Sequence, residues 1–426
     1  MSTPHAPADL TFSTVDVHAT EGEALQRLHA YGDAWSRGFH EGSMSEKQRE
    51  AWLEHSRADD VTLRAAYPTG PLVDTTQPVG TFSSWDGSMN VGAERMLGLH
   101  MITDVTVAPT HRRRGILSRL MREDLTAAAE RGVPLAALTV SEGGIYGRFG
   151  FGVATRRRRV TVTARAGEFA LRHLEDDGTL VLLDPAAAAV HTTAVFEQHL
   201  ARTRGAVTRP SFYRRLAEGF DFESGEPDTK LRCVLHLDAA GQPDGYAYWK
   251  HAQEGGASRV DVGMAQALTG VAHLRLWQFL TDVDLAHEVR ATLPLEAPLD
   301  AAVTDPRAVR TDEVRDMLWL RVLDVPAALE ARPWREDGAV VLDVADPLGL
   351  AGGRFRLTTA KGVASVTPTQ DPADVHLGVE TLGALYLGDR GVHTHAAAGR
   401  VTGPGVATFA ALADDAGPAP WCSTGF

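Results

Sequence analysis

The sequence predicts a mixed α/β and α+β architecture folded as three consecutive domains, on three observations. Its 426 residues exceed the length at which a single hydrophobic core stops growing, about 250–300 residues. Segments with the 3.6-residue period of helices alternate with segments that have the two-residue period of strands. A proline- and aspartate-containing stretch over 293–309 indicates a boundary. We therefore expect domains at residues 1–165, 166–310 and 311–426.

The first segment mixes helices and strands. Apolar residues at steps of three and four predict helices over 24–39, 46–58 and from Ile116 to a stop at Gly132. Alternation over 96–107 predicts a half-buried strand, and the apolar run 133–140 predicts a buried one. A strand pair is expected over 62–68 and 81–92, with Asp86 and Gly87 as turn residues.

The middle segment repeats this order. A hairpin is expected over 231–251, then a strand over 258–268 and a helix over 270–284. The last segment has strands over 339–344, 354–359 and 364–369 that flank a helix over 379–388, which predicts a small α+β domain.

Charge and composition limit the class of protein. The formal net charge of −13 argues against a general nucleic-acid binder and favours attraction of cationic small molecules. No apolar run approaches the roughly 20 residues that span a bilayer, and the N-terminus lacks the pattern of a signal peptide. Cys233 and Cys422 cannot form a disulfide framework and lack metal-ligand spacing. We expect a cytoplasmic protein without a membrane span or a metal site.

The stretch VAPTHRRRGIL places Arg112, Arg113, Arg114 and Gly115 between a strand and a helix. The first N–H groups of a helix are unpaired, and with the helix dipole they form an anion site. Guanidinium groups add bidentate partners for phosphate oxygens, and glycine lets a ligand approach the backbone. The alternative is a solvated basic turn, paired with carboxylates on the next turns of the helix.

Two strings carry a resemblance to a known family. RRRGIL resembles the pyrophosphate loop of the GCN5-related N-acetyltransferases (GNAT), although Leu117 stands where glycine or alanine is usual. VAPTHRRRGIL followed by SEGGIYGRFGFG resembles the enhanced intracellular survival (Eis) branch of that superfamily. The resemblance implies two tandem GNAT-like domains, the second degenerate, followed by a sterol-carrier-protein-like domain whose C-terminus docks into the active site.

The resemblance also implies acetyl-CoA as acetyl donor and places its contacts. The strand end Val105, Thr106 and Val107 would offer backbone groups to the pantetheine arm. The pyrophosphate would be wrapped by Arg113, Arg114, Gly115, Ile116, Leu117 and Ser118, and the cleft would be completed by Ser141 and Glu142.

Tyr146 is the candidate general acid. Acetyl transfer from a thioester to an amine must protonate a departing thiolate. A phenol, with an ordinary pKa near 10, is close to a thiol near 8.5. The alternative is that Tyr146 forms an aromatic core cluster with Phe149 and Phe151; the family pattern favours the acid.

Phe426 is the candidate source of the general base. Trp421 and Phe426 bring large apolar area to the very end of the chain, which predicts a docked terminus. Burial of its α-carboxylate would raise the pKa and make the group a better base. In Eis-like proteins the C-terminal carboxylate has this role, so we assign it here; the alternative is a terminus that only caps the last domain.

These assignments predict an acetyl-CoA-dependent N-acetyltransferase. The expected acceptor is a primary amine of a polycation, an aminoglycoside or a lysine side chain, and transfer is expected to be direct because no cysteine lies near the motifs. Cys422 is the thiol nearest to the proposed site in sequence and leaves a covalent route to be assayed. Possible acceptor contacts, each more often an ordinary helix residue, are Asp33, Trp35, Glu41 and Trp52.

The sequence also leaves two alternative functions open. A non-enzymatic lipid- or sterol-binding protein would use the C-terminal domain, and a nucleic-acid-binding regulator would need a basic surface. The run Arg156–Arg159 alternates between strand faces, which favours a solvated or interdomain salt-bridged strand. His393 and His395 lack a third ligand nearby, so they predict no metal site. The resemblance implies a homo-oligomer, a hexamer.

Overall fold

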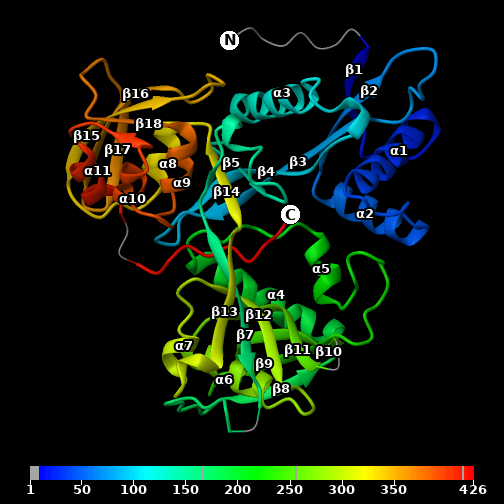
Figure 1. Cartoon of the computed structure of the whole chain (residues 1–426), viewed down its shortest axis with the longest axis vertical. Coiled ribbons are helices and arrows are strands. Elements are labelled where there is room, and N and C mark those ends of the chain that lie inside the picture. Colours follow the sequence, from blue (N-terminus) through cyan, green and yellow to red (C-terminus); the bar gives the residue numbers. More distant parts are fainter. Residues whose placement is uncertain (1–8, 166, 255–256, 415–416) are drawn as a thin grey trace.

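Three β-sheets with their helices organise the chain in a computed structural model that describes residues 9–165, 167–254, 257–414 and 417–426 (Figure 1). The first sheet and the helices around it lie beside the third, and the second lies below both. Within these ranges no helix combines the length and apolar character needed to cross a bilayer.

The first sheet has seven strands in the order β1-β2-β3-β4-β5-β14-β6. Helices α1 and α2 pack on one face and α3 on the other, so each face has its own apolar cluster. The elements are β1 (Leu10–Val15), α1 (Gly22–Gly38), α2 (Glu46–Ala58), β2 (Thr62–Pro68), β3 (Gly80–Asn90), β4 (Met96–Val107), η1 (Pro109–His111), α3 (Ile116–Glu130), β5 (Leu135–Thr139), η2 (Gly147–Phe149), β6 (Gly152–Val153) and β14 (Leu318–Val322).

The second sheet also has seven strands, in the order β13-β7-β12-β11-β10-β9-β8. Helix α6 packs on the face that holds Val260 and Val289, and α4 packs on the opposite face. The elements are β7 (Arg156–Thr163), β8 (Thr179–Leu183), α4 (Pro185–Arg202), α5 (Phe212–Ala217), β9 (Arg232–Leu237), β10 (Pro243–Glu254), β11 (Ala257–Ala267), α6 (Gly270–Thr281), β12 (Glu288–Pro294), α7 (Leu299–Ala302), η3 (Pro306–Ala308) and β13 (Val309–Asp316).

The third sheet has five strands in the order β17-β16-β15-β18-β19. Its core continues into that of the first sheet, because Leu342 and Phe409 belong to the same apolar cluster as Leu320. The elements are α8 (Val325–Ala331), β15 (Gly338–Ala345), β16 (Gly353–Ala360), β17 (Val363–Pro368), β18 (Val375–Gly378), α9 (Val379–Leu385), α10 (Val392–Ala397), β19 (Val401–Thr402) and α11 (Val406–Ala413).

The first two sheets exchange strands across the expected domain boundaries. Strand β7 lies before residue 165 but pairs with β12 and β13 of the second sheet. Strand β14 follows residue 310 but pairs with β5 and β6 of the first sheet. The boundaries at 165 and 310 stay predictions, and the hydrogen-bonded sheets run across both.

The arginine run lies in β7, and three of its side chains, Arg156, Arg158 and Arg159, form ion pairs, as expected. Arg156 binds Asp389 of the third domain at 2.7 Å, and Arg158 binds Asp300 at 2.9 Å. A second interdomain pair is fully buried, where Arg321 of β14 meets Asp346 at 2.7 Å. Because an unpaired buried charge is costly, these pairs favour one arrangement of the domains.

The expected turn at Asp86 and Gly87 is wrong. Strand β3 continues through both residues, which pair with His100 and Leu99 of β4. The chain turns after Asn90, where Gly92 has a φ of 109°. Asp86 is held in the strand because its carboxylate binds the His100 ring at 2.7 Å.

Candidate active site

A β-bulge interrupts β4 where its pairing with β5 has ended. Thr103 pairs with Ser83 and Thr106 with Thr81, so Asp104 and Val105 together oppose one residue of β3. The parallel pairing of β4 with β5 covers only Leu99–Ile102. Backbone groups at the end of β4, the expected pantetheine contacts, therefore have no ladder partner on the β5 side.

The arginine loop forms a concave set of backbone N–H groups before α3. Arg113 has a φ of 62° and Gly115 one of 78°, the left-handed conformations that turn successive N–H groups toward one anion. The first turn of α3 holds no acidic residue, and Gly115 provides no side-chain cap. The loop residues thus fit a diphosphate, because the helix N–H groups are not satisfied from within the helix.

The side chains of the loop divide between solvent and protein. Arg112 and Arg113 are exposed, whereas Ile116 is buried and anchors the start of α3. Arg114 donates a hydrogen bond to Asp9, and this bond lowers the pKa of that carboxyl. Arg113 therefore has no partner among the residues that the structure describes. Arg114 is bound to a carboxylate, with which an anion must compete.

Tyr146 lies on the same side of the first sheet as the expected donor contacts. It belongs to the apolar cluster that contains Ile116, and Val105 and Val107 pack against that cluster. Its ring meets Phe151 edge to face at 6.4 Å, so the aromatic cluster is also present. Burial, together with the negative charge of Glu142, raises the pKa of Tyr146 above its ordinary value. The phenol is therefore protonated at neutral pH, as an acid requires.

Ser141 and Glu142 are exposed and follow β5 after one intervening residue, Val140. They lie on the segment that leads from the end of β5 to Tyr146. Their contact with the cofactor stays a prediction.

The C-terminal tail runs between the first two sheets and ends at β5 (Figure 1). Gly425 N–H donates to the Tyr213 hydroxyl at 2.8 Å, and Thr424 is buried. The Thr139 hydroxyl, at the end of β5, donates to the carboxylate of Phe426. The Phe426 ring packs edge to face on Trp85 at 5.6 Å. The last residues are therefore held against β5 and α5, and their role in an active site stays a prediction.

An aromatic cavity of about 390 Å³ opens beside the terminus. A second chamber of about 140 Å³ adjoins it and shares six of its lining residues. These shared residues come from α1 and its following loop, from α2, and from the segment around α5: Trp35, Glu41, Trp52, His55, Phe212 and Phe222.

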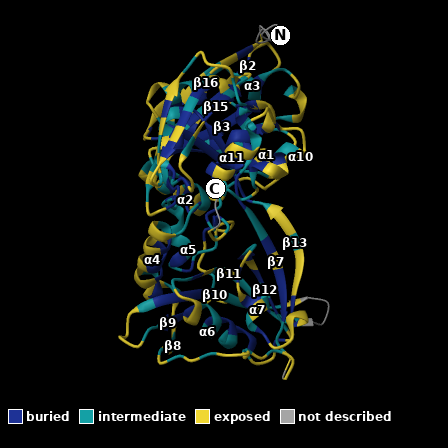
Figure 2. Ribbon diagram, turned by 90° about the vertical axis from the view of Figure 1, so that its left-hand side faces the viewer, coloured by how far each residue is buried: buried dark blue, intermediate teal, exposed yellow. Residues whose placement is uncertain are grey.

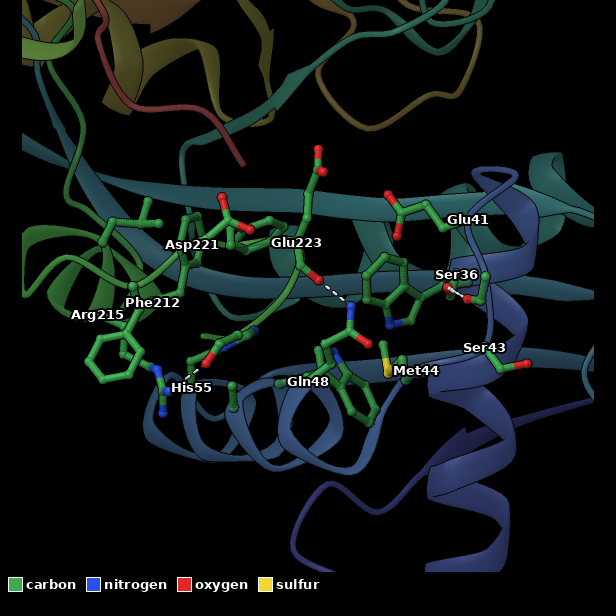
Figure 3. A pocket seen from close by; sticks show the side chains of 18 residues that line it. Ser36, Glu41, Ser43, Met44, Gln48, His55, Phe212, Arg215, Asp221 and Glu223 are labelled. Atoms are coloured by element: carbon green, nitrogen blue, oxygen red, sulfur yellow. Dashed lines mark hydrogen bonds between the residues drawn. The ribbon is translucent and has the colours of Figure 1, made fainter. Parts of the chain in front are cut away.

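Carboxylates are the negatively charged groups of both chambers, and the smaller chamber also has the guanidinium of Arg215. Asp59 and Asp104 line the larger one with Glu41, and Asp221 and Glu223 line the smaller. Figure 3 shows the carboxylates of Glu41, Asp221 and Glu223 standing over α2, from the loops after α1 and α5. Burial lowers the pKa of His55 to about 4, so this lining residue is neutral at pH 7. The cavity therefore suits a cation.

Asp104 is a half-buried carboxylate of this lining. It occupies the β4 bulge with a φ of 50° and accepts a hydrogen bond from Ser83 at 2.8 Å. Burial, with the nearby charge of Glu41, raises the pKa of Asp104 to about 6. A nearby positive charge would stabilise the ionised form of this carboxyl and offset its poor solvation.

Three of the four residues that the sequence indicated as possible acceptor contacts line the cavity. Trp35, Glu41 and Trp52 line the cavity, whereas Asp33 lines neither chamber because Arg49 holds it at 2.8 Å. The sequence did not indicate Asp104 or the residues of the second domain, Phe212, Asp221 and Glu223. These residues lie far from the two motifs in the sequence. A β-bulge, or a cavity wall built from two domains, leaves no local sequence pattern.

Cys422 is fully buried, and burial raises the pKa of its thiol to about 12. It is therefore protonated at neutral pH and a poor nucleophile. Among the described residues, no three His, Cys, Asp or Glu side chains are grouped as metal ligands.

Comparisons with known proteins agree with this architecture. Family models described as acetyltransferase (GNAT) domains match residues 27–154 and 205–322, and a sterol carrier protein domain matches 325–423. An uncharacterized N-acetyltransferase of Streptomyces griseus is 38% identical over 81% of this chain and 86% of its own length. N-acetyltransferase Eis of Mycobacterium tuberculosis is 35% identical over 76% of this chain and 80% of its own.

Solved structures share the whole layout. Eis1 from Mycobacterium abscessus is 29% identical and superposes with a TM-score of 0.79, over 98% of this chain and 100% of that one. A GCN5-related N-acetyltransferase from Anabaena variabilis, 18% identical with a TM-score of 0.80 over 98% and 100% of the two chains, shares the fold.

Proposed function

Because the chain belongs to the Eis family of GCN5-related N-acetyltransferases, we propose that it acetylates primary amines of a polycationic acceptor, an aminoglycoside or a lysine-type amine. The observation that carries this proposal is the cavity in which aromatic rings and carboxylates surround the docked C-terminus. Aromatic faces and carboxylates together bind ammonium groups.

The donor side is assigned to the β4 end and the loop before α3. Backbone groups of Val105–Val107 hold the pantetheine arm of acetyl-CoA, and the N–H groups of Gly115–Ser118 hold its diphosphate. Arg113 and Arg114 neutralise the phosphate charge, and Ser141 and Glu142 border the thioester end. Support comes from the two left-handed loop residues and the uncapped helix.

The acid and the base are assigned to opposite faces of the first sheet. The carboxylate of Phe426 accepts a proton from the acceptor ammonium, and the resulting amine forms the new C–N bond as the C–S bond breaks. The hydroxyl of Tyr146 gives its proton to the departing sulfur. The buried, protonated phenol and the terminus held by Thr139 support these roles.

Direct transfer is preferred to a covalent acetyl-enzyme. The only thiol near the site in sequence, Cys422, bonds to the Thr424 carbonyl and is buried and protonated. Replacement of Cys422 by alanine should therefore preserve turnover. A dead Cys422→Ala enzyme that still folds would restore the covalent route.

The proposal is tested with acetyl-CoA and a panel of acceptors. Thiol release and product mass are measured for an aminoglycoside, a lysine peptide, a simple monoamine and a neutral sugar. Polyamines are expected to react best and the sugar not at all. Thiol release with none of the amines would overturn the proposal, and equal rates for the monoamine and the polyamines would remove the polycation preference.

Lipid or sterol binding through the third domain is not favoured. The cavities described above are lined by the first two domains and the tail. A cytoplasmic, hexameric enzyme is proposed from the family resemblance; light scattering of the purified protein measures the assembly.

A further inference from the structure

Strand β11 of the second sheet repeats the bulge of β4. Met264 pairs with Tyr248 and Val262 with Trp249, so Gly263 has no partner on β10. Like β4 and β5, the strands β11 and β12 pair in parallel over a short stretch only, at Arg259–Asp261. The second domain thus keeps the local geometry that opens the first sheet at its donor side.

A cavity of about 290 Å³ lies at this opening. Strand β11 from Val262 on, the end of β12 and helix α6 form its walls, and α6 lies under β11 in Figure 2. The C-terminal tail closes it with Pro418, Ala419 and Trp421. The lining is mainly apolar, as in sites for small organic molecules, and the volume is at the lower end of their range. Its one carboxylate, Glu296, accepts a hydrogen bond from the N–H of Ala419 at 3.0 Å.

Two residues that line this cavity, His199 and His273, have ring nitrogens buried behind its apolar wall. The Nε2 atoms of His199 and His273 are buried and have no hydrogen-bond partner among the described residues. Burial lowers the pKa of each ring to about 4, so both are neutral at pH 7. His199 is also fixed by a contact of 3.1 Å between its Nδ1 and the hydroxyl of Thr203. A buried polar atom without a partner is costly, and a ligand group that pairs with it removes that cost.

The opening lacks the anion site of the first domain. Thr269 caps α6, and its hydroxyl accepts a hydrogen bond from the N–H of Ala272 at 3.1 Å. The same hydroxyl donates to the carboxylate of Asp244 at 2.9 Å. A helix start that is capped and next to a carboxylate repels phosphate. The occupant is therefore uncharged at this end.

We propose that the cavity between β11, β12 and α6 is a second ligand site, which takes an uncharged, elongated molecule with amide or hydroxyl groups, the class to which pantetheine belongs. The apolar walls bury the chain of the ligand, and the rings of His199 and His273 turn so that their buried Nε2 atoms pair with its polar groups. This site is separate from the acetyl-transfer site and does not depend on the function proposed above.

Gly263 provides a way to block the cavity without disturbing the fold. A Cβ added there meets no atom within 4 Å, and the residue does not have the left-handed conformation that excludes side chains. Leucine at this position would project into free space beside the wall it lines. Gly270 is the matched control, because a Cβ there also meets no atom within 4 Å and Gly270 does not line the cavity.

The test is calorimetric titration of pantetheine into protein saturated with coenzyme A, which occupies the first site. Wild type and Gly270→Leu should bind pantetheine, and Gly263→Leu should bind it at least about tenfold more weakly, a loss of about 1.4 kcal/mol. Unchanged melting temperatures without ligand show that the variants are folded. The difference between wild type and Gly263→Leu assigns the heat of pantetheine binding to this cavity, whatever ligand occupies the first site.

His273→Phe gives a second, independent readout. It removes the unpartnered nitrogen, so the ligand-free variant should melt at or above the wild-type temperature and yet bind pantetheine more weakly. Equal affinities in wild type and Gly263→Leu, or no heat in the wild type at millimolar pantetheine, would overturn the proposal. Equal affinity in His273→Phe would overturn the role of the imidazole.

Discussion

The hydroxyl of Thr139, at the end of the central strand β5, hydrogen-bonds the carboxylate of Phe426, 287 positions later in the chain. The backbone N–H of Phe426 approaches the same hydroxyl at 3.4 Å. The Thr139 side chain therefore contacts both the backbone N–H and the carboxylate of Phe426, at the place where β4 and β5 separate. The position of the proposed base depends on this contact.

Thr139→Val should lower kcat and leave the KM for acetyl-CoA unchanged, because valine keeps the shape of the side chain and loses the hydrogen bond. A charged hydrogen bond contributes about 1.5–3 kcal/mol, so a decrease of about tenfold or more is expected. Steady-state kinetics of Thr139→Val and Thr139→Ser check this. Thr139→Ser retains the hydroxyl and should recover most of the rate; a Thr139→Val enzyme with wild-type kcat would show that Thr139 does not position the carboxylate.

Extension of the chain beyond Phe426 by a short Gly-Ser tail should abolish turnover while acetyl-CoA still binds. The extension converts the terminal carboxylate into a neutral amide, and loss of a general base costs about 10²–10⁴-fold in rate. Calorimetry measures acetyl-CoA binding, and thiol release measures turnover. The same tail added before residue 1 is the control. Full activity of the C-terminally extended protein would remove the carboxylate from the mechanism.

Tyr146→Phe should lower kcat by about 10²–10⁴-fold with little change in acetyl-CoA affinity, because only the proton donor is lost. The raised pKa keeps the phenol protonated, so wild-type activity should persist into alkaline pH with respect to this group. Tyr67→Phe is a matched control, because Tyr67 is buried in β2 and its hydroxyl has no partner among the described residues. Equal rates for Tyr146→Phe and wild type would leave Tyr146 as a core residue.

Arg113→Ala should raise the Kd for acetyl-CoA by about tenfold or more, since each charged hydrogen bond to phosphate is worth about 1.5–3 kcal/mol. Affinity for pantetheine at the same site should not change, because pantetheine lacks the diphosphate. Arg122→Ala, an exposed arginine further along α3, is the control. Equal Kd values for Arg113→Ala and wild type would place the phosphates elsewhere.

Asp104→Asn should stabilise the protein at pH 7.5, and the gain should vanish near pH 4. The pKa of Asp104 is raised in the folded state from 3.8 to about 6, so the folded protein binds this proton more tightly than the unfolded chain. Its contribution to stability is present below about pH 4 and is lost as the pH rises through 6. Asparagine is neutral throughout and tolerates the positive φ.

Denaturant unfolding of both proteins at the two pH values measures this difference. Asp60→Asn is the control, because Asp60 also has a positive φ, 48°, but its side chain is 88% exposed. If Asp104→Asn has the same stability as wild type at both pH values, the carboxyl is not poorly solvated in the cavity.

Local pattern predicted most of the elements. The helices α1, α2 and α3 and the strand β4 lie where their periodicities place them, because an amphipathic repeat depends on neighbours within one or two turns. The arginine loop was also found from its composition, since a glycine and adjacent cations before a helix are local requirements of an anion site. The error at Asp86 and Gly87 shows the limit of such patterns: cross-strand pairing with β4 overrides a common turn dipeptide.

The sequence by itself determined the three groups of elements, the arginine loop that is expected to bind the donor, and the apolar character of the C-terminus. Only the tertiary structure decided that Phe426 ends beside Thr139, that β7 and β14 change sheets, and that Asp221 and Glu223 join Glu41 around one cavity. The reason is physical: each local element is stabilised by residues close in the chain, whereas the site forms by packing of segments whose separation carries no periodic signal.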